Sequence, residues 1–249
     1  MEIDFLVEVT LLGLFAGVIG TGSGGMLSLL FRKPHRTTLS LILGLSAGIM
    51  LVVIFLELLQ EAFEIGGRSQ GILGLTLGIL VLWFLDIIFP HLHLIFREGE
   101  GARYLKAGVL LGIGIALHNI PEGLAIGAGY ASTTELGNGL ALIMAVHNIP
   151  EGVAMATTML IGKARPWKVM AATFLAGLPM GIGAWIGGYV GSISSTFLSL
   201  SLGFAAGAML YIVCDELIPD AHTFAEEGHY ATLGIVGGVL IGLLIGILP

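Results

Sequence analysis

The sequence contains one six-residue motif twice, His-Asn-Ile-Pro-Glu-Gly, at positions 118–123 and again at 147–152. Successive residues of an α-helix are rotated by about 100°, so His118 and Glu122 project from the same face about one turn apart. A carboxylate in that position can bind an ion beside His118, beside Asn119, or between the two. The motif therefore indicates a ligand site, and its duplication indicates that both copies contribute to one shared site.

Together the two motifs supply two imidazoles and two carboxylates, from His118, Glu122, His147 and Glu151. Zinc and other divalent first-row metals bind mixed nitrogen and oxygen ligands, whereas calcium and magnesium favour sites made of oxygen alone. The two glutamates neutralise one divalent cation, and a second cation would leave uncompensated charge in an apolar interior. We therefore expect one well-occupied metal and at most a weaker second. The structural alternative is a pair of helix kinks whose polar side chains bond only to each other.

Each motif also contains a proline and a glycine. Pro121 and Pro150 lack an N–H group and leave the carbonyls of Leu117 and Val146 without their usual helical partner. At membrane depth such groups are tolerated where they meet protein or line a polar cavity. The glycine that follows each glutamate allows a neighbouring helix or an ion to come close.

The elements that position these motifs are apolar. The chain has 249 residues, of which 56% are hydrophobic and 11% charged, and its mean hydropathy is +0.99. A soluble domain has about 25% charged residues, so this composition predicts a polytopic membrane protein. The single cysteine, Cys214, excludes an internal disulfide and a cysteine-rich metal cluster. No basic segment precedes the first apolar stretch, so we expect no cleaved signal peptide.

A membrane-spanning helix needs about 20 apolar residues. On this criterion we predict an all-α, single-domain protein over residues 1–249, with eight spans. Nine of the ten basic residues fall in the loops after the first, third and fifth spans, and only Arg68 lies on the other side. The positive-inside rule places those three loops in the cytoplasm and both termini outside. The predicted spans are 5–30, 38–63, 70–90, 105–130, 137–161, 168–190, 197–219 and 231–248.

The second and seventh spans resemble each other. Residues 44–64 and 203–222 each begin with small residues, continue to a methionine and end with acidic residues. This similarity predicts an inverted repeat, an arrangement common in transporters whose site lies near the membrane midplane.

Other ionisable residues in or near the spans are weaker candidates. Glu57, Glu61 and Glu64 lie toward the outer end of the second span, where a solvated helix end is the simple interpretation, and we favour it for Glu64. Glu57 lies deeper and can belong to an entrance route, and Asp86 is expected to be buried and paired. Met50 is expected to pack in the core, as most methionines do. Several histidines and glutamates cluster at the predicted cytoplasmic side, where they can collect a released metal: His91, His93, His222, His229, Glu226 and Glu227.

The duplicated motif, together with residues 46–50, 82–93 and 205–222, resembles the ZIP (Zrt-, Irt-like protein) family of divalent metal transporters, in particular its short prokaryotic GufA-like branch. The resemblance covers nearly the whole chain and implies a metal site between the fourth and fifth spans. It implies that Met50 joins the four His and Glu ligands, and that a companion site uses Asn119 and Asn148 with both glutamates bridging. It further implies that Asp215 and Glu216 line the route, that transport follows an elevator-like movement, and that the protein forms a homodimer.

One position departs from the family pattern. The family usually has Glu-Pro in the sixth span, where the glutamate completes the companion site, but this chain has Leu178-Pro179. The loss of that carboxylate agrees with the charge argument for a single strong metal site.

These observations predict a secondary transporter for divalent metals in a multi-pass bacterial inner membrane protein. Zinc is the first choice, with iron, manganese or cadmium as further cargo, and the metal moves toward the cytoplasm. The expected partners are divalent metal ions and the lipid bilayer, without nucleic acid or a resident cofactor.

No phosphate-binding GxxxxGK[ST] motif is present, which argues against an ATP-driven pump. The alternatives are an intramembrane zinc-dependent hydrolase that uses the same His/Glu set, and a metal sensor without transport. The absence of HExxH argues against the hydrolase.

Overall fold

A computed structural model describes residues 3–31, 35–88, 100–225 and 228–246. All regular structure within these residues is helical, as the composition predicts. The helices are α1 (Ile3–Phe31), α2 (Arg36–Val52), the π-helical η1 (Val53–Leu58), α3 (Leu59–Ile88), α4 (Glu100–Ser132), α5 (Thr134–Ile161), α6 (Pro166–Gly177), α7 (Pro179–Gly191), α8 (Ser195–Ile212), the π-helical η3 (Val213–Leu217), α9 (Ile218–Ala225) and α10 (Tyr230–Gly246).

Short local signals end and restart these helices. Gly67 has φ 80° and ψ 164°, a conformation that glycine tolerates best, and it breaks α3 between the predicted second and third spans. Thr133 alone separates α4 from α5, and its side chain accepts a hydrogen bond from the N–H of Leu136 at 3.1 Å. Pro179 separates α6 from α7 because it has no N–H to continue the helix. The motif-bearing helices α4 and α5 therefore form a tight hairpin.

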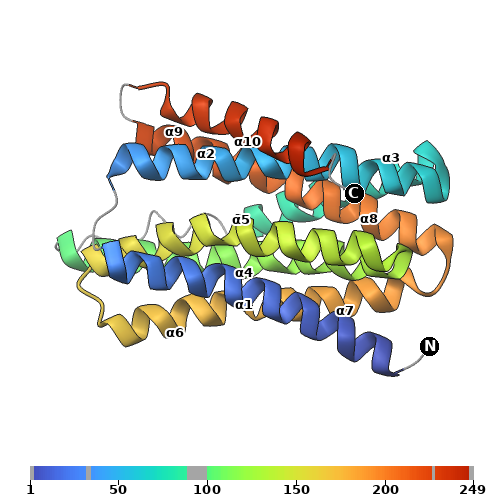
Figure 1. Cartoon of the computed structure of the whole chain (residues 1–249), viewed down its shortest axis with the longest axis horizontal. Helices are drawn as coiled ribbons and strands as arrows, with labels where there is room; N and C mark the ends of the chain where they lie inside the picture. Colours follow the sequence, from blue (N-terminus) through green and yellow to red (C-terminus); the bar gives the residue numbers. More distant parts are fainter. Residues whose placement is uncertain (1–2, 32–34, 89–99, 226–227, 247–249) are drawn as a thin grey trace.

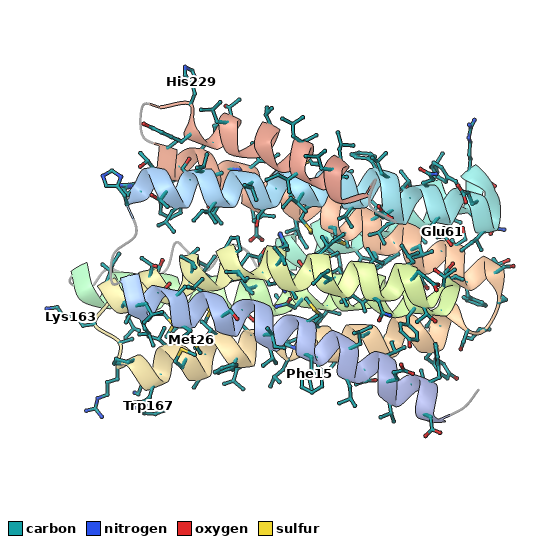
Figure 2. All side chains as sticks on the ribbon, in the orientation of Figure 1. Phe15, Met26, Glu61, Lys163, Trp167 and His229 are labelled. Atoms are coloured by element: carbon teal, nitrogen blue, oxygen red, sulfur yellow. The ribbon has the colours of Figure 1, made fainter. Side chains whose placement is uncertain are left out.

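The structure agrees with a polytopic membrane protein. Among the described residues, five helical segments are long and apolar enough to cross a membrane: Asp4–Leu30, Arg36–Phe84, Thr134–Ile161, Pro166–Gly191 and Ser195–Ala225. Large apolar side chains such as Phe15, Met26 and Trp167 are more than half exposed and project from the outside of the bundle (Figure 2). Soluble proteins rarely expose so much apolar surface, which suits contact with lipid. The count of eight spans and the orientation of the termini stay predictions.

The helices pack in two groups, which Figure 1 shows one above the other. The first group contains α1, α4, α5, α6 and α7, and the second contains α2, α3, α8, α9 and α10. The groups meet mainly where α4 and α7 contact α8 and where α2 contacts α5. Both copies of the motif therefore lie in the first group, next to the boundary with the second.

Candidate metal centre

Each motif lies inside an unbroken helix, with Pro121 within α4 and Pro150 within α5. The glycine after each glutamate lies against a neighbouring helix. A Cβ atom on Gly123 would overlap the backbone oxygen of Met180 in α7, and one on Gly152 would overlap that of Thr21 in α1. The expected close approach of a neighbouring helix is therefore confirmed at both motifs.

Three of the motif residues converge. The Nε2 atom of His147 lies 3.3 Å from Oε1 of Glu122 and 3.2 Å from Oε1 of Glu151. One ligand atom from each of the three side chains lies within 4.8 Å of the other two, and all three residues are buried. One imidazole and two carboxylates from two different helices thus surround a single point.

The polar atoms of this cluster lack hydrogen-bond partners. Glu122 and Glu151 each have a buried Oε2 atom without a partner, and neither ring nitrogen of His147 makes a hydrogen bond. The Nε2 contacts to the two carboxylates are short enough for ion pairs but do not have hydrogen-bond geometry. Buried polar atoms are nearly always paired in folded proteins, so an unpaired group of this kind is the expected environment of a bound cation.

His118, the fourth predicted ligand, is not one of these three converging residues. Its Nε2 atom lies 3.1 Å from Oε1 of Glu216, in η3 of the other helix group. His118 and Glu151 both line a pocket of about 20 Å³, enough to hold one water-sized particle. The other residues of this pocket are Leu43, Leu111, Ile115, Ala154, Glu216, Leu217 and Asp220.

The two motif asparagines bond to each other. The side-chain N–H of Asn148 donates to Oδ1 of Asn119 at 2.8 Å, and Asn119 donates to the backbone oxygen of Ala176 in α6 at 2.8 Å. Both asparagines are fully buried. Leu178, where the family has glutamate, is 41% exposed and lines a surface hollow with Thr10 and Trp185. The structure therefore brings no carboxylate from α6 or α7 to the asparagine pair.

Helix α2 reaches the site through a residue that the sequence analysis missed. The hydroxyl of Ser46 donates to the backbone oxygen of His147 at 3.2 Å. Met50 lies one turn further along α2 and is buried within the hydrophobic core. The small-residue segment before Met50 was the available signal for Ser46. Asp220 was also missed, although it lies one turn after Glu216 on the same side of the helix.

The remaining candidates lie apart from the cluster. Glu57 is half-buried in η1, Asp215 is exposed in η3, and His222 is exposed with its Nδ1 atom 2.9 Å from the backbone oxygen of Ile218. Glu61 accepts a hydrogen bond from Ser132, and Glu64 and His229 are exposed. His91, His93, Glu226 and Glu227 lie outside the described residues, as does the side chain of Asp86.

Comparisons with known proteins place the chain in one family. A family model described as "ZIP Zinc transporter" matches residues 96–246, more than half of the chain. The protein named zinc transporter ZupT from Chlorobium chlorochromatii is 31% identical to this chain, and the match covers 96% of each protein. ZupT from Akkermansia muciniphila is also 31% identical, and the match covers 97% of each protein. ZupT from Chlorobium limicola is 34% identical over 92% of both chains. With the apolar helices and the buried His/Glu cluster already described, these matches show that the chain is a multi-pass membrane protein of the ZIP zinc transporter family.

Proposed function

We propose that this protein carries divalent metal ions, zinc first, across the bacterial inner membrane toward the cytoplasm. The observation that carries the proposal is the buried cluster of Glu122, His147 and Glu151, in which both Oε2 atoms and both ring nitrogens have no hydrogen-bond partner. A divalent cation between these side chains satisfies the unpaired atoms and neutralises both carboxylates. The mixture of one nitrogen and two oxygen ligands suits zinc, with iron, manganese and cadmium as further cargo by family resemblance.

The pocket beside the cluster supplies a route for release. It begins at Glu151 and His118 and includes Glu216 and Asp220, which attract a cation away from the cluster. Asp220 belongs to α9. The C-terminal end of α9 lies near the start of α2, as shown by the hydrogen bond from Arg36, the first residue of α2, to the backbone oxygen of Thr223 in α9. The distribution of basic residues places that end in the cytoplasm. This structure therefore suits the release of a metal into the cell.

The two helix groups provide the moving parts. The metal ligands belong to α4 and α5 in the first group, whereas Glu216 and Ser46 belong to the second. In an elevator-like movement the first group slides against the second and carries the metal with it. The contacts His118–Glu216 and Ser46–His147 cross the boundary between the groups, so they break and reform in each cycle.

We also propose that one metal ion is tightly bound per chain. The asparagines of the companion position bond to each other and to the backbone of Ala176, so their side chains are already partly occupied. The carboxylate that the family has at position 178 is absent. A second dication beside the two glutamates would therefore remain uncompensated.

Family membership supports a transporter over the hydrolase that the same ligand set allows. Every carboxylate and imidazole of the cluster is needed to surround the cation. Of the further histidines and glutamates among the described residues, His118 and Glu216 line the adjoining pocket, and each is engaged by the other at 3.1 Å.

Zinc uptake into proteoliposomes tests the proposal directly. The intact protein is expected to transport zinc and to retain about one zinc ion per chain after desalting. The double variant Glu122→Gln with Glu151→Gln keeps the side-chain volumes but removes both charges, so it is expected to lose both retention and uptake. Metal content is measured by elemental analysis of the same preparations.

Glu135→Gln is the matched control, because Glu135 is an exposed glutamate on α5, the helix that also carries Glu151. It is expected to leave uptake unchanged. Normal uptake by the double variant would contradict the assigned site. Retention without uptake by the intact protein would favour a metal sensor or a hydrolase instead.

A further inference from the structure

The second and seventh predicted spans match residue by residue at a constant offset of 159 positions. Gly44, Gly48 and Met50 correspond to Gly203, Gly207 and Met209. After each methionine the helix changes to a π-helical segment, η1 in one case and η3 in the other. π-Helical segments are rare and often mark functional sites, so their presence in both copies is independent support for a repeat.

The packing of these two helices is also duplicated. Gly44 and Gly48 of α2 lie against the backbone of α10, at Ala231 and Ile235, and their counterparts in α8 lie against the backbone of α3, at Gly71 and Leu75. The two copies run in opposite directions. The start of α2 is bonded to the end of α9 through Arg36, and the start of α8 is bonded to α3 through the hydroxyl of Ser199 and the backbone oxygen of Ala62. The repeat is therefore inverted.

The hairpin of α4 and α5 fits the same symmetry. An offset of 29 positions superposes the two motifs, so His118 corresponds to His147 and Glu122 to Glu151. Every residue of the pocket beside His118 thus has a counterpart on the opposite side of the metal cluster. In the seventh span, Glu216 and Asp220 correspond to Glu57 and Glu61 of the second.

The two sides differ in how closely they are packed. Six residues on the pocket side are 3–7% exposed, whereas their six counterparts are 0–2% exposed. The pairs, pocket side first, are Leu43 and Leu202, Ile115 and Met144, His118 and His147, Glu151 and Glu122, Ala154 and Ala125, and Leu217 and Leu58. Leu111 is half-buried, but its counterpart Leu140 is fully buried. The pocket side is therefore slightly more open than the equivalent space on the other side.

We propose that Glu57 is the ion-receiving counterpart of Glu216. In the state open to the other side, Glu57 contacts His147 as Glu216 contacts His118 here, and Leu140, Met144 and Leu58 line the pocket that then opens. Glu61 takes the place of Asp220 at its mouth. This inference rests on the proposed transport function, and it assigns a role to a glutamate that the metal cluster does not use.

The present contacts of Glu61 explain how that side is kept closed. Glu61 accepts a hydrogen bond from Ser132, the last residue of α4, and this bond ties the first helix group to the second (Figure 2 labels Glu61). Opening of this side requires the bond to break, which frees Glu61 for an incoming cation. Glu57 lies one turn before Glu61, so the two carboxylates guide the ion inward from the mouth to His147.

Thiol labelling tests for the second state without any transport measurement. Single cysteines replace Leu111, Leu140 and the fully buried Ile126 in a Cys214→Ser background, and a charged, membrane-impermeant thiol reagent is added from either side. Leu111→Cys is expected to react only from the side of Asp220, and Leu140→Cys only from the side of Glu61. Ile126→Cys, whose counterpart Met155 does not line the pocket, is expected to stay unlabelled. An unreactive Leu140→Cys beside a reactive Leu111→Cys would overturn the proposal.

Zinc flux into membrane vesicles of both orientations tests the role of Glu57. Loss of a charge-assisted contact weakens binding by roughly tenfold. Glu57→Gln is expected to raise KM about tenfold for zinc arriving from the Glu61 side and to leave KM from the other side unchanged. Glu216→Gln is expected to do the reverse.

Glu64→Gln is the control. Glu64 is an exposed glutamate about two helical turns after Glu57, and its counterpart in the seventh span is the uncharged Thr223. Glu57→Asp keeps the charge and is expected to restore most of the affinity. An effect of Glu57→Gln no larger than that of Glu64→Gln, or equal from both sides, would overturn the proposal. If the intact protein moved no zinc, the transport function would fail, whereas the labelling result would still decide whether the second state exists.

Discussion

At the scale of single residues, polar groups buried at membrane depth determine what the site can do. Glu122, His147 and Glu151 keep buried atoms without hydrogen-bond partners and suit a cation. Asn119 bonds to Asn148 and to Ala176, and only Oδ1 of Asn148 is left without a partner in that pair. The different residue types of the motif thus perform different tasks. The carboxylates and one imidazole form the binding site, and the asparagine of α4 joins that helix to α6.

The hydrogen bonds of Asn119 are expected to stabilise the fold. Asn119→Ala leaves the amide of Asn148 and the backbone oxygen of Ala176 without partners in a buried region. Each unsatisfied group costs about 1–3 kcal/mol, so the free energy of unfolding is expected to fall by roughly 2–6 kcal/mol. Thermal unfolding in detergent measures the effect. Asn138→Ala, at an exposed position of α5, is expected to change nothing, and equal effects of the two variants would contradict this account.

At the scale of helices, glycines set how closely the elements approach each other. A Cβ on Gly48 would overlap the backbone oxygen of Ile235 in α10, whereas one on Gly237 of α10 would meet no atom within 4 Å. Without a strong hydrophobic force between helices in lipid, this close packing supplies much of their association. The helices that support η1 and Met50 are positioned in this way.

Gly48→Ala is therefore expected to push α2 and α10 apart. Overpacking of a tight contact costs about 1–3 kcal/mol, which should appear as a lower unfolding temperature. Gly237→Ala is the control on the partner helix, and it is expected to be neutral or stabilising because alanine favours the helix by about 1 kcal/mol. A Gly48→Ala protein as stable as the Gly237→Ala protein would show that the α2–α10 contact is looser than described.

At the scale of the whole molecule, the boundary between the two helix groups is where movement must occur. Leu111 of the first group and Leu217 of the second line the same pocket. A short bifunctional thiol reagent that joins cysteines at these positions, in a Cys214→Ser background, is expected to stop zinc flux while zinc retention continues. Cleavage of the link should restore the flux.

The same reagent between Leu14→Cys and Ile182→Cys joins two residues of the first group, α1 to α7, which line a surface hollow apart from the release pocket, and is expected to permit transport. Flux assays on vesicles before and after cross-linking compare the two pairs. Undiminished flux with the Leu111–Leu217 link would show that the groups do not move against each other.

Local sequence signals predicted the helices, the duplicated motif and the metal chemistry, because these depend on composition and on residues within one or two turns. Some helices begin and end close to a predicted span, for example Thr134–Ile161 against the predicted 137–161. The predicted sixth span, 168–190, is instead divided into α6 and α7. Pairing of His147 with Glu151 follows from helical spacing alone. Membership of the metal transporter family also followed from the motif, and the comparisons confirmed it.

Only the tertiary structure decided which long-range partners these residues have. Spacing relates His118 to Glu122, but the contact of His118 with Glu216 joins residues from different helix groups. Ser46, Asp220 and the outward position of Leu178 likewise depend on how helices rotate and pack. A sequence specifies the face of each helix, whereas the face that opposes it is set by close packing between segments far apart in the chain.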